Sequence, residues 1–272
     1  MRKLYLGRHV YGIAAIGFGI ISFTWHDLAG PWQQAQAFGN TSHHESFAYI
    51  AAAVELLGGL AVQWRRTARA AAIVLATIFS IFALLWIPRA LAAPRVYDGY
   101  GNFFEQLSIV SGGLIICALF SENPKRTAWL ARLGYYFFAT CVISFMLVHL
   151  FSFSAVVSFT PKWIPPSQKF WAVVTTIAFP LAAIAFFTGR AALLASRLLT
   201  AMIIGFGVFV WLPRPFADPH QLFNWGGNAQ NLAIAGAAWI LADYLAEKRR
   251  AVPEPSPATA SVGGTFVSAM FH

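Results

Sequence analysis

Two arginines occupy the same place in a short motif that the sequence contains twice. The motif reads Trp-Ile-Pro-Arg at 86–89 and Trp-Leu-Pro-Arg at 211–214. Arg89 and Arg214 each offer a planar fork of donors that suits a carboxylate, a phosphate or a quinone carbonyl. Each also follows a long apolar run, where an arginine beside a tryptophan can anchor a helix end among lipid headgroups. Ligand binding and anchoring therefore both remain open.

Polar side chains follow each motif at the start of the next apolar run. Glu105 and Gln106 in the first copy align with Gln230 and Asn231 in the second. Polar residues on the first turn of a helix can cap its free amide groups. They can equally add hydrogen-bonding groups to a ligand site beside the arginines, and Glu105 would then handle a proton.

Glu55 lies in the middle of an otherwise apolar run. An ionised carboxyl at such a depth in a membrane is costly, so we expect it to be protonated, paired or facing a polar cavity. A catalytic proton carrier and a structural hydrogen bond between helices both fit. Pro180 occupies the equivalent place in the second copy, so only the first could use a carboxyl there.

Two histidines lie at the ends of equivalent apolar runs, His26 in the first copy and His149 in the second. Facing histidines can hold a haem at its axial positions, and single ones at a membrane surface can bond water or backbone. We include both among the candidate ligand-binding residues. Cys117 and Cys141 stand alone in apolar runs, so we expect no metal site.

The composition excludes an ordinary soluble domain. Of the 272 residues, 58% are hydrophobic and only 11% are charged, whereas soluble domains carry about 25% charged residues. No phosphate-binding loop or nucleophile-elbow motif of a soluble enzyme is present in the sequence. The chain therefore uses the lipid bilayer as its solvent.

Apolar runs predict an all-α polytopic membrane protein with eight transmembrane helices, since a span needs about 20 apolar residues. The predicted spans are roughly 10–25, 46–64, 70–87, 103–120, 133–150, 169–187, 194–211 and 228–245. Tryptophans fall near most of the predicted ends, as interface anchoring requires.

The basic residues orient the predicted spans. If the amino terminus is cytoplasmic, 14 of the 19 Lys and Arg residues fall in inner segments and 5 in outer loops. The positive-inside rule then places both termini in the cytoplasm. It also accounts for the net charge of +9 without a nucleic-acid partner.

The repeated motifs predict two four-helix units, 1–122 and 123–250, followed by a disordered tail at 251–272. Because four spans return the chain to its starting side, the two units would be parallel repeats. We expect a seam between them, with the candidate site residues at its outer end.

The sequence resembles the DoxX-like family of small four-span bacterial membrane proteins. The resemblance rests on Val-Glu-Leu-Leu-Gly-Gly-Leu at 54–60, Arg-Arg-Thr-Ala-Arg at 65–69 and the stretch at 228–236. It covers roughly 8–120 and 130–245 as a tandem pair, whereas the family unit is usually single.

The family includes the membrane subunit of a quinone-linked thiosulfate oxidoreductase. The resemblance therefore implies a bacterial inner-membrane protein that serves a redox system, with a quinone as ligand and a redox partner protein. No cofactor is visible in the sequence itself, and whether the chain is an enzyme stays open. A small-solute carrier or channel and a scaffold for a membrane complex are the alternatives.

Overall fold

The computed structural model describes residues 5–33 and 42–251, and within them the chain is all α. The long helices are α1 (Leu6–Trp25), α2 (Ser42–Ala61), α3 (Ala68–Leu85), α5 (Asp98–Leu119), α6 (Pro124–Phe151), α8 (Gln168–Thr188), α9 (Ala192–Phe206) and α11 (Leu222–Ala251). The short elements are η1 (Pro31–Gln33), α4 (Ile87–Ala92), α7 (Phe153–Phe159), the π-helical turn η3 (Gly207–Trp211) and α10 (Arg214–Ala217). Each predicted span lies in or overlaps one long helix. The predicted tail lies outside the described residues except for Ala251, which ends α11.

Six segments among the described residues are long and apolar enough to cross a membrane. They are Leu6–Trp25, Ala68–Ala92, Asp98–Leu119, Pro124–Phe151, Gln168–Thr188 and Ala192–Ala217. The chain is therefore a polytopic helical membrane protein. Helices α2 and α11 are also long enough to span but are more polar, because α2 begins with His43, His44 and Glu45 and α11 carries amides and a basic end.

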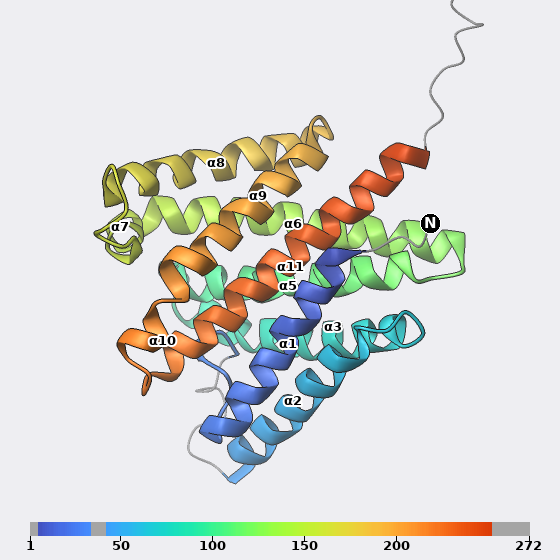
Figure 1. The fold of residues 1–272 in the computed structure, drawn as a ribbon, viewed down its shortest axis with the longest axis horizontal. Helices are drawn as coiled ribbons and strands as arrows, with labels where there is room; N and C mark the ends of the chain where they lie inside the picture. The colour runs from blue at the N-terminus through green and yellow to red at the C-terminus, as the bar shows by residue number, and fades with distance from the viewer. Residues whose placement is uncertain (1–4, 34–41, 252–272) are drawn as a thin grey trace, which may run out of the picture.

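The long helices run back and forth along the molecule, so α1 begins and α11 ends on the same side (Figure 1). We name the side where α1 begins the basic end, because the arginines and lysines of the turns gather there, among them Arg65, Lys125 and Lys248. The opposite side, where α5, α8 and α11 begin, is the site end. At the basic end, short turns at 62–67, 120–123 and 189–191 join consecutive antiparallel helices.

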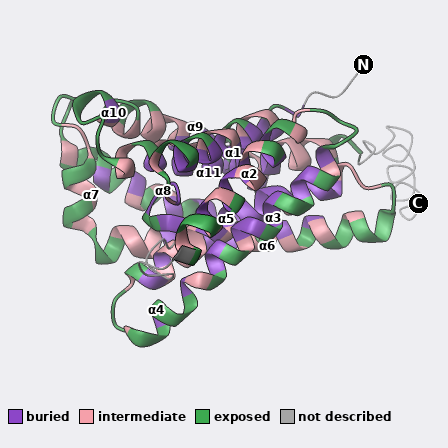
Figure 2. Cartoon of the chain, turned by 90° about the horizontal axis from the view of Figure 1, so that it is seen from below, coloured by how far each residue is buried: buried purple, intermediate pink, exposed green. Residues whose placement is uncertain are grey.

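Helices α1, α5 and α11 form the centre of the bundle. Helix α1 packs between α2 and α11, and α5 packs against α3, α6 and α11. Buried residues concentrate on these central helices (Figure 2). Large apolar side chains such as Leu57, Leu181 and Leu198 are more than half exposed on the outer helices. Such a surface suits lipid, whereas in water it would favour aggregation.

Small residues let the central helices approach one another closely. A Cβ atom added at Gly236 of α11 would lie 2.6 Å from the backbone nitrogen of Tyr11 in α1. Similar close approaches occur at Gly19 and Gly59, between α1 and α2. Close backbone packing supplies dispersion contacts that replace the hydrophobic effect inside a membrane.

Replacing Gly236 by alanine should therefore destabilise the protein by about 1–3 kcal/mol through overpacking. The matched control is Gly205→Ala in α9, where an added Cβ meets no atom within 4 Å. Denaturant titration in detergent micelles measures both free energies of unfolding. Equal effects of the two substitutions would contradict the proposed role of the α1–α11 contact.

Candidate functional site

Part of the chain that follows α1, residues 28–33, packs inside the bundle instead of staying at its surface. Leu28, Ala29, Trp32 and Gln33 are all buried. Non-helical backbone is tolerated at membrane depth only where protein surrounds it and satisfies its polar groups. Gly226 of α11 makes room for this inserted segment (residues 28–33), because a Cβ there would lie 1.8 Å from the Ala29 carbonyl oxygen.

The backbone carbonyl of Trp32 joins the inserted segment to the end of α3 and to α5. It accepts hydrogen bonds from Trp86 Nε1 at 2.7 Å and from Gln106 Nε2 at 3.1 Å. Gln106 Nε2 also donates to Gln230 Oε1 at 3.2 Å, and Gln230 Nε2 donates to Glu105 Oε2 at 3.4 Å. Four segments of the chain are thereby connected through buried polar groups.

Gln33 anchors the other end of the inserted segment. Its Oε1 accepts from the Ala29 amide at 2.8 Å, and its Nε2 donates to Glu55 Oε1 at 2.6 Å. Glu55 is fully buried, and its second oxygen has no hydrogen-bond partner among the described residues. The hydrogen bond of Glu55 therefore joins α2 to the inserted segment.

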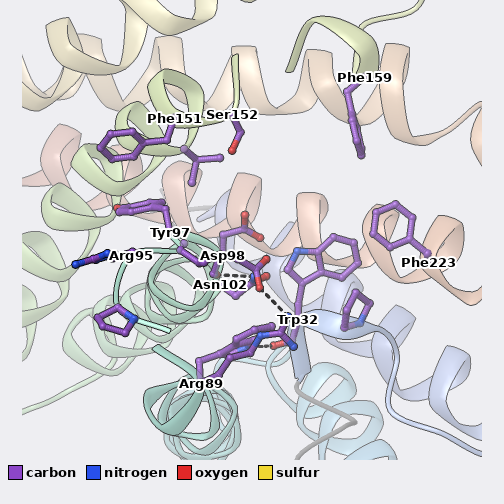
Figure 3. Close-up of a pocket in the computed structure, with 17 residues that line it drawn as sticks. Trp32, Arg89, Arg95, Tyr97, Asp98, Asn102, Phe151, Ser152, Phe159 and Phe223 are labelled. Carbon is purple, nitrogen blue, oxygen red and sulfur yellow. Dashed lines mark hydrogen bonds and ion pairs between the residues drawn. The ribbon is translucent and has the colours of Figure 1, made fainter. Parts of the chain in front are cut away.

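A cavity of about 1000 Å³, the large cavity, opens at the site end (Figure 3). Six aromatic rings line it, from Trp32, Trp86, Tyr97, Phe151, Phe159 and Phe223. Its main polar side chains are Arg89, Arg95, Asp98, Asn102, Glu105 and Ser152. Binding sites for small molecules combine apolar walls with a few convergent polar groups in this way.

Arg89 is held in place within the large cavity. Its Nη2 lies 3.2 Å from Asp98 Oδ2, and its guanidinium carbon lies 5.5 Å from the centre of the Trp86 ring. Asn102 donates to the other Asp98 oxygen at 3.1 Å. Because Arg89 and Asp98 are each about half exposed, their ion pair contributes only about 0–1 kcal/mol. The pair therefore orients the guanidinium more than it stabilises the fold.

Tyr97 also lines the large cavity. Its hydroxyl donates to Ser144 Oγ at 3.0 Å. Burial raises the pKa of the Tyr97 phenol above its ordinary value, although the bond to Ser144 opposes that shift. The phenol therefore keeps its proton at neutral pH.

A second cavity of about 180 Å³, the small cavity, adjoins the large one. Trp32, Glu105 and Val148 line both cavities. His149 and Asn231 line the small cavity but not the large one. The polar groups of the small cavity also bond to protein: Asn231 Nδ2 donates to the Ile203 carbonyl at 2.9 Å, and His149 Nδ1 lies 3.2 Å from Thr176 Oγ1.

The structure brings most of the predicted site residues together. Arg89 and Glu105 line the large cavity, and Glu105, His149, Gln230 and Asn231 line the small one. Gln106 lies behind them, bonded to Gln230. This grouping joins residues from both halves of the chain.

Three predicted residues lie elsewhere. Arg214 lines neither cavity, and its guanidinium carbon lies 4.2 Å from the centre of the Phe159 ring. His26 bonds to Tyr49 and does not share a cavity with His149, so the geometry offers no axial haem site between them. Glu55 lines neither cavity. Within the described residues, no group of three or more His, Cys, Asp or Glu side chains is placed to hold a metal.

Sequence reasoning missed the inserted segment and the acidic partner of Arg89. Trp32 lies in a connection between predicted spans, where no periodicity indicates burial, and Asp98 lies in another such connection, before the predicted span 103–120. The one signal in the sequence for this segment is the tripeptide Pro-Trp-Gln at 31–33, which places an aromatic ring and an amide in a connecting loop. Comparison with models of protein families, with curated proteins and with solved structures finds no match.

Replacing Trp86 by phenylalanine removes one of the two hydrogen-bond donors to the buried Trp32 carbonyl. The substitution should therefore destabilise the protein by about 1–3 kcal/mol. Hydrogen exchange in residues 28–33 should become faster. The matched control is Trp171→Phe, which removes an exposed Nε1 bond to the Pro165 carbonyl and should change stability by less than about 0.5 kcal/mol. Unchanged exchange at 28–33 would show that the Trp32 carbonyl does not hold the segment.

Proposed function

We propose that the chain consists of two DoxX-like four-helix units in tandem, with eight spans that run in the same sense in both halves. The pattern of helix contacts supports this, because it repeats: α1 packs on α2 as α6 packs on α8, and α3 packs on α5 as α9 packs on α11. Across the halves, α1 packs on α11 as α6 packs on α5. The first helix of each unit therefore lies against the last helix of the other.

Helices α2 and α11 complete the eight proposed spans. At 1.5 Å per residue, their 20 and 30 residues extend about 30 Å and 45 Å, enough for a hydrocarbon core of about 30 Å. Their polar side chains need not meet lipid, since Glu55, Gln230 and Asn231 are buried. We place the protein in a bacterial inner membrane with the basic end in the cytoplasm, on the positive-inside rule.

We infer that the large cavity binds the head group of a quinone and that the protein is a subunit or accessory of a membrane redox system. The observation that carries this proposal is the combination of aromatic walls with an oriented Arg89 in one cavity of about 1000 Å³. A quinone head is planar and carries carbonyl acceptors. Trp32 and Phe223 already stack, with ring centres 5.1 Å apart, which supports a binding surface for flat rings.

Glu105 is our candidate for proton transfer. Reduction of a quinone to a quinol takes up two electrons and two protons, and we assign the electrons to a redox partner protein. Glu105 lines both cavities and accepts a hydrogen bond from Gln230. It is therefore placed to pass protons between the ligand and the polar groups of the small cavity.

The first test is extraction of the detergent-purified protein and mass spectrometry for quinone, followed by titration with decyl-ubiquinone monitored by tryptophan fluorescence. Arg89→Ala should weaken binding about tenfold or more, since a hydrogen bond to a charged group contributes about 1.5–3 kcal/mol. Arg214→Ala, which removes the equivalent arginine outside the cavity, should change affinity less than about twofold. Equal losses in the two variants, or no quinone binding by the wild-type protein, would contradict the proposed site.

One observation favours a small-solute carrier as the second candidate. The two cavities share Trp32, Glu105 and Val148, so the small cavity lies beside the large one and carries the polar side chains of His149, Gln230 and Asn231. A carrier would move solute into proteoliposomes without an electron donor, and Glu105→Gln would change that flux. Binding of quinone without any such flux would favour the redox role.

A further inference from the structure

A second cluster of polar side chains lies at the basic end, away from both cavities. Arg8 of α1 and Arg65 of the turn after α2 converge on the ring of Phe120, which follows α5. Their guanidinium carbons lie 5.1 Å and 5.6 Å from the centre of that ring. The two positive charges are therefore at most the sum of these distances apart.

The guanidinium of Arg8 is buried with part of its hydrogen-bonding capacity unused. The residue is 5% exposed, and neither Nε nor Nη1 has a hydrogen-bond partner among the described residues. Its Nη2 lies 3.1 Å from His9 Nε2, while His9 Nδ1 lies 2.6 Å from Gln63 Oε1. A neutral His9 that donates through Nδ1 can accept from Arg8 through Nε2, so His9 orients the arginine without neutralising it.

The carboxylates nearby are engaged with other groups. Glu247 accepts a hydrogen bond from the Tyr5 hydroxyl, and Asp243 Oδ2 accepts from the Gly7 amide at 3.0 Å. Neither Arg8 nor Arg65 forms an ion pair within the part of the chain that the structure describes. A buried cation without an anionic partner is costly, and the Phe120 ring offsets only part of that cost.

We infer that Arg8 and Arg65 together bind a phosphoryl anion. A phosphate group brings several acceptor oxygens, which suit arginine donors and can satisfy two guanidinium groups at once. The cluster lies at the end of the spans, at the level where lipid headgroups meet a helix bundle. Both an anionic lipid headgroup and free inorganic phosphate carry the required chemistry.

The test compares the full-length protein with Arg65→Gln, because Arg65 is exposed and its loss leaves the core intact. The matched control is Arg190→Gln, which removes an exposed arginine from the turn before α9 at the same end. Native mass spectrometry of the delipidated protein measures binding of phosphatidylglycerol and of phosphatidylcholine. Thermal melting measures stabilisation by inorganic phosphate against chloride at equal ionic strength.

The wild-type protein should prefer phosphatidylglycerol to phosphatidylcholine or be stabilised by inorganic phosphate. Arg65→Gln should weaken that binding about tenfold and Arg190→Gln less than twofold, since only Arg65 shares the ring with Arg8. Binding of the lipid without a phosphate effect identifies the headgroup as ligand, and the reverse identifies free phosphate. Equal losses in the two variants, or no preference and no stabilisation in the wild type, would overturn the assignment.

Discussion

The buried backbone of the inserted segment is the constraint on which the site depends. A non-helical stretch inside a membrane bundle must find partners for its amide and carbonyl groups within the protein, because lipid supplies none. The Trp32 carbonyl takes two donors from different helices, and Gln33 satisfies the Ala29 amide. The Trp32 ring therefore has a fixed position, and both cavities are built against it.

This constraint also explains why the two helices that serve the segment look less like membrane spans than the others. Glu55 on α2 is a buried polar residue that bonds to the segment, and Gln230 on α11 bonds to Gln106, which itself bonds to the segment. Each lowers the hydropathy of its helix while facing protein instead of lipid. Polar groups that organise a site inside a bundle thus reduce the signal by which a span is recognised.

The helices could be predicted from the sequence because the length of an apolar run is a local property, and each predicted span overlaps a long helix. The contact between Glu105 and Gln230 could be anticipated in part, since the repeat aligns these two residues. The partner of Glu55 could not, because Gln33 lies in a loop whose burial has no periodic signature. The ion pair of Arg89 with Asp98 depends on how the chain turns before α5, which composition does not determine.

The proposed tandem arrangement has a consequence for the number of ligand sites. Arg89 and Arg214 are equivalent in sequence, yet Arg89 lines the large cavity and Arg214 lines neither the large nor the small one. In the second half, the Trp211 ring fills the space over Gly227 and packs on Phe159 and Phe223. Arg214 lies on the Phe159 and Trp211 rings instead of facing open volume. Under the proposed tandem arrangement, aromatic side chains surround Arg214 at the place that corresponds to the large cavity beside Arg89, so we expect one ligand for the two copies of the motif.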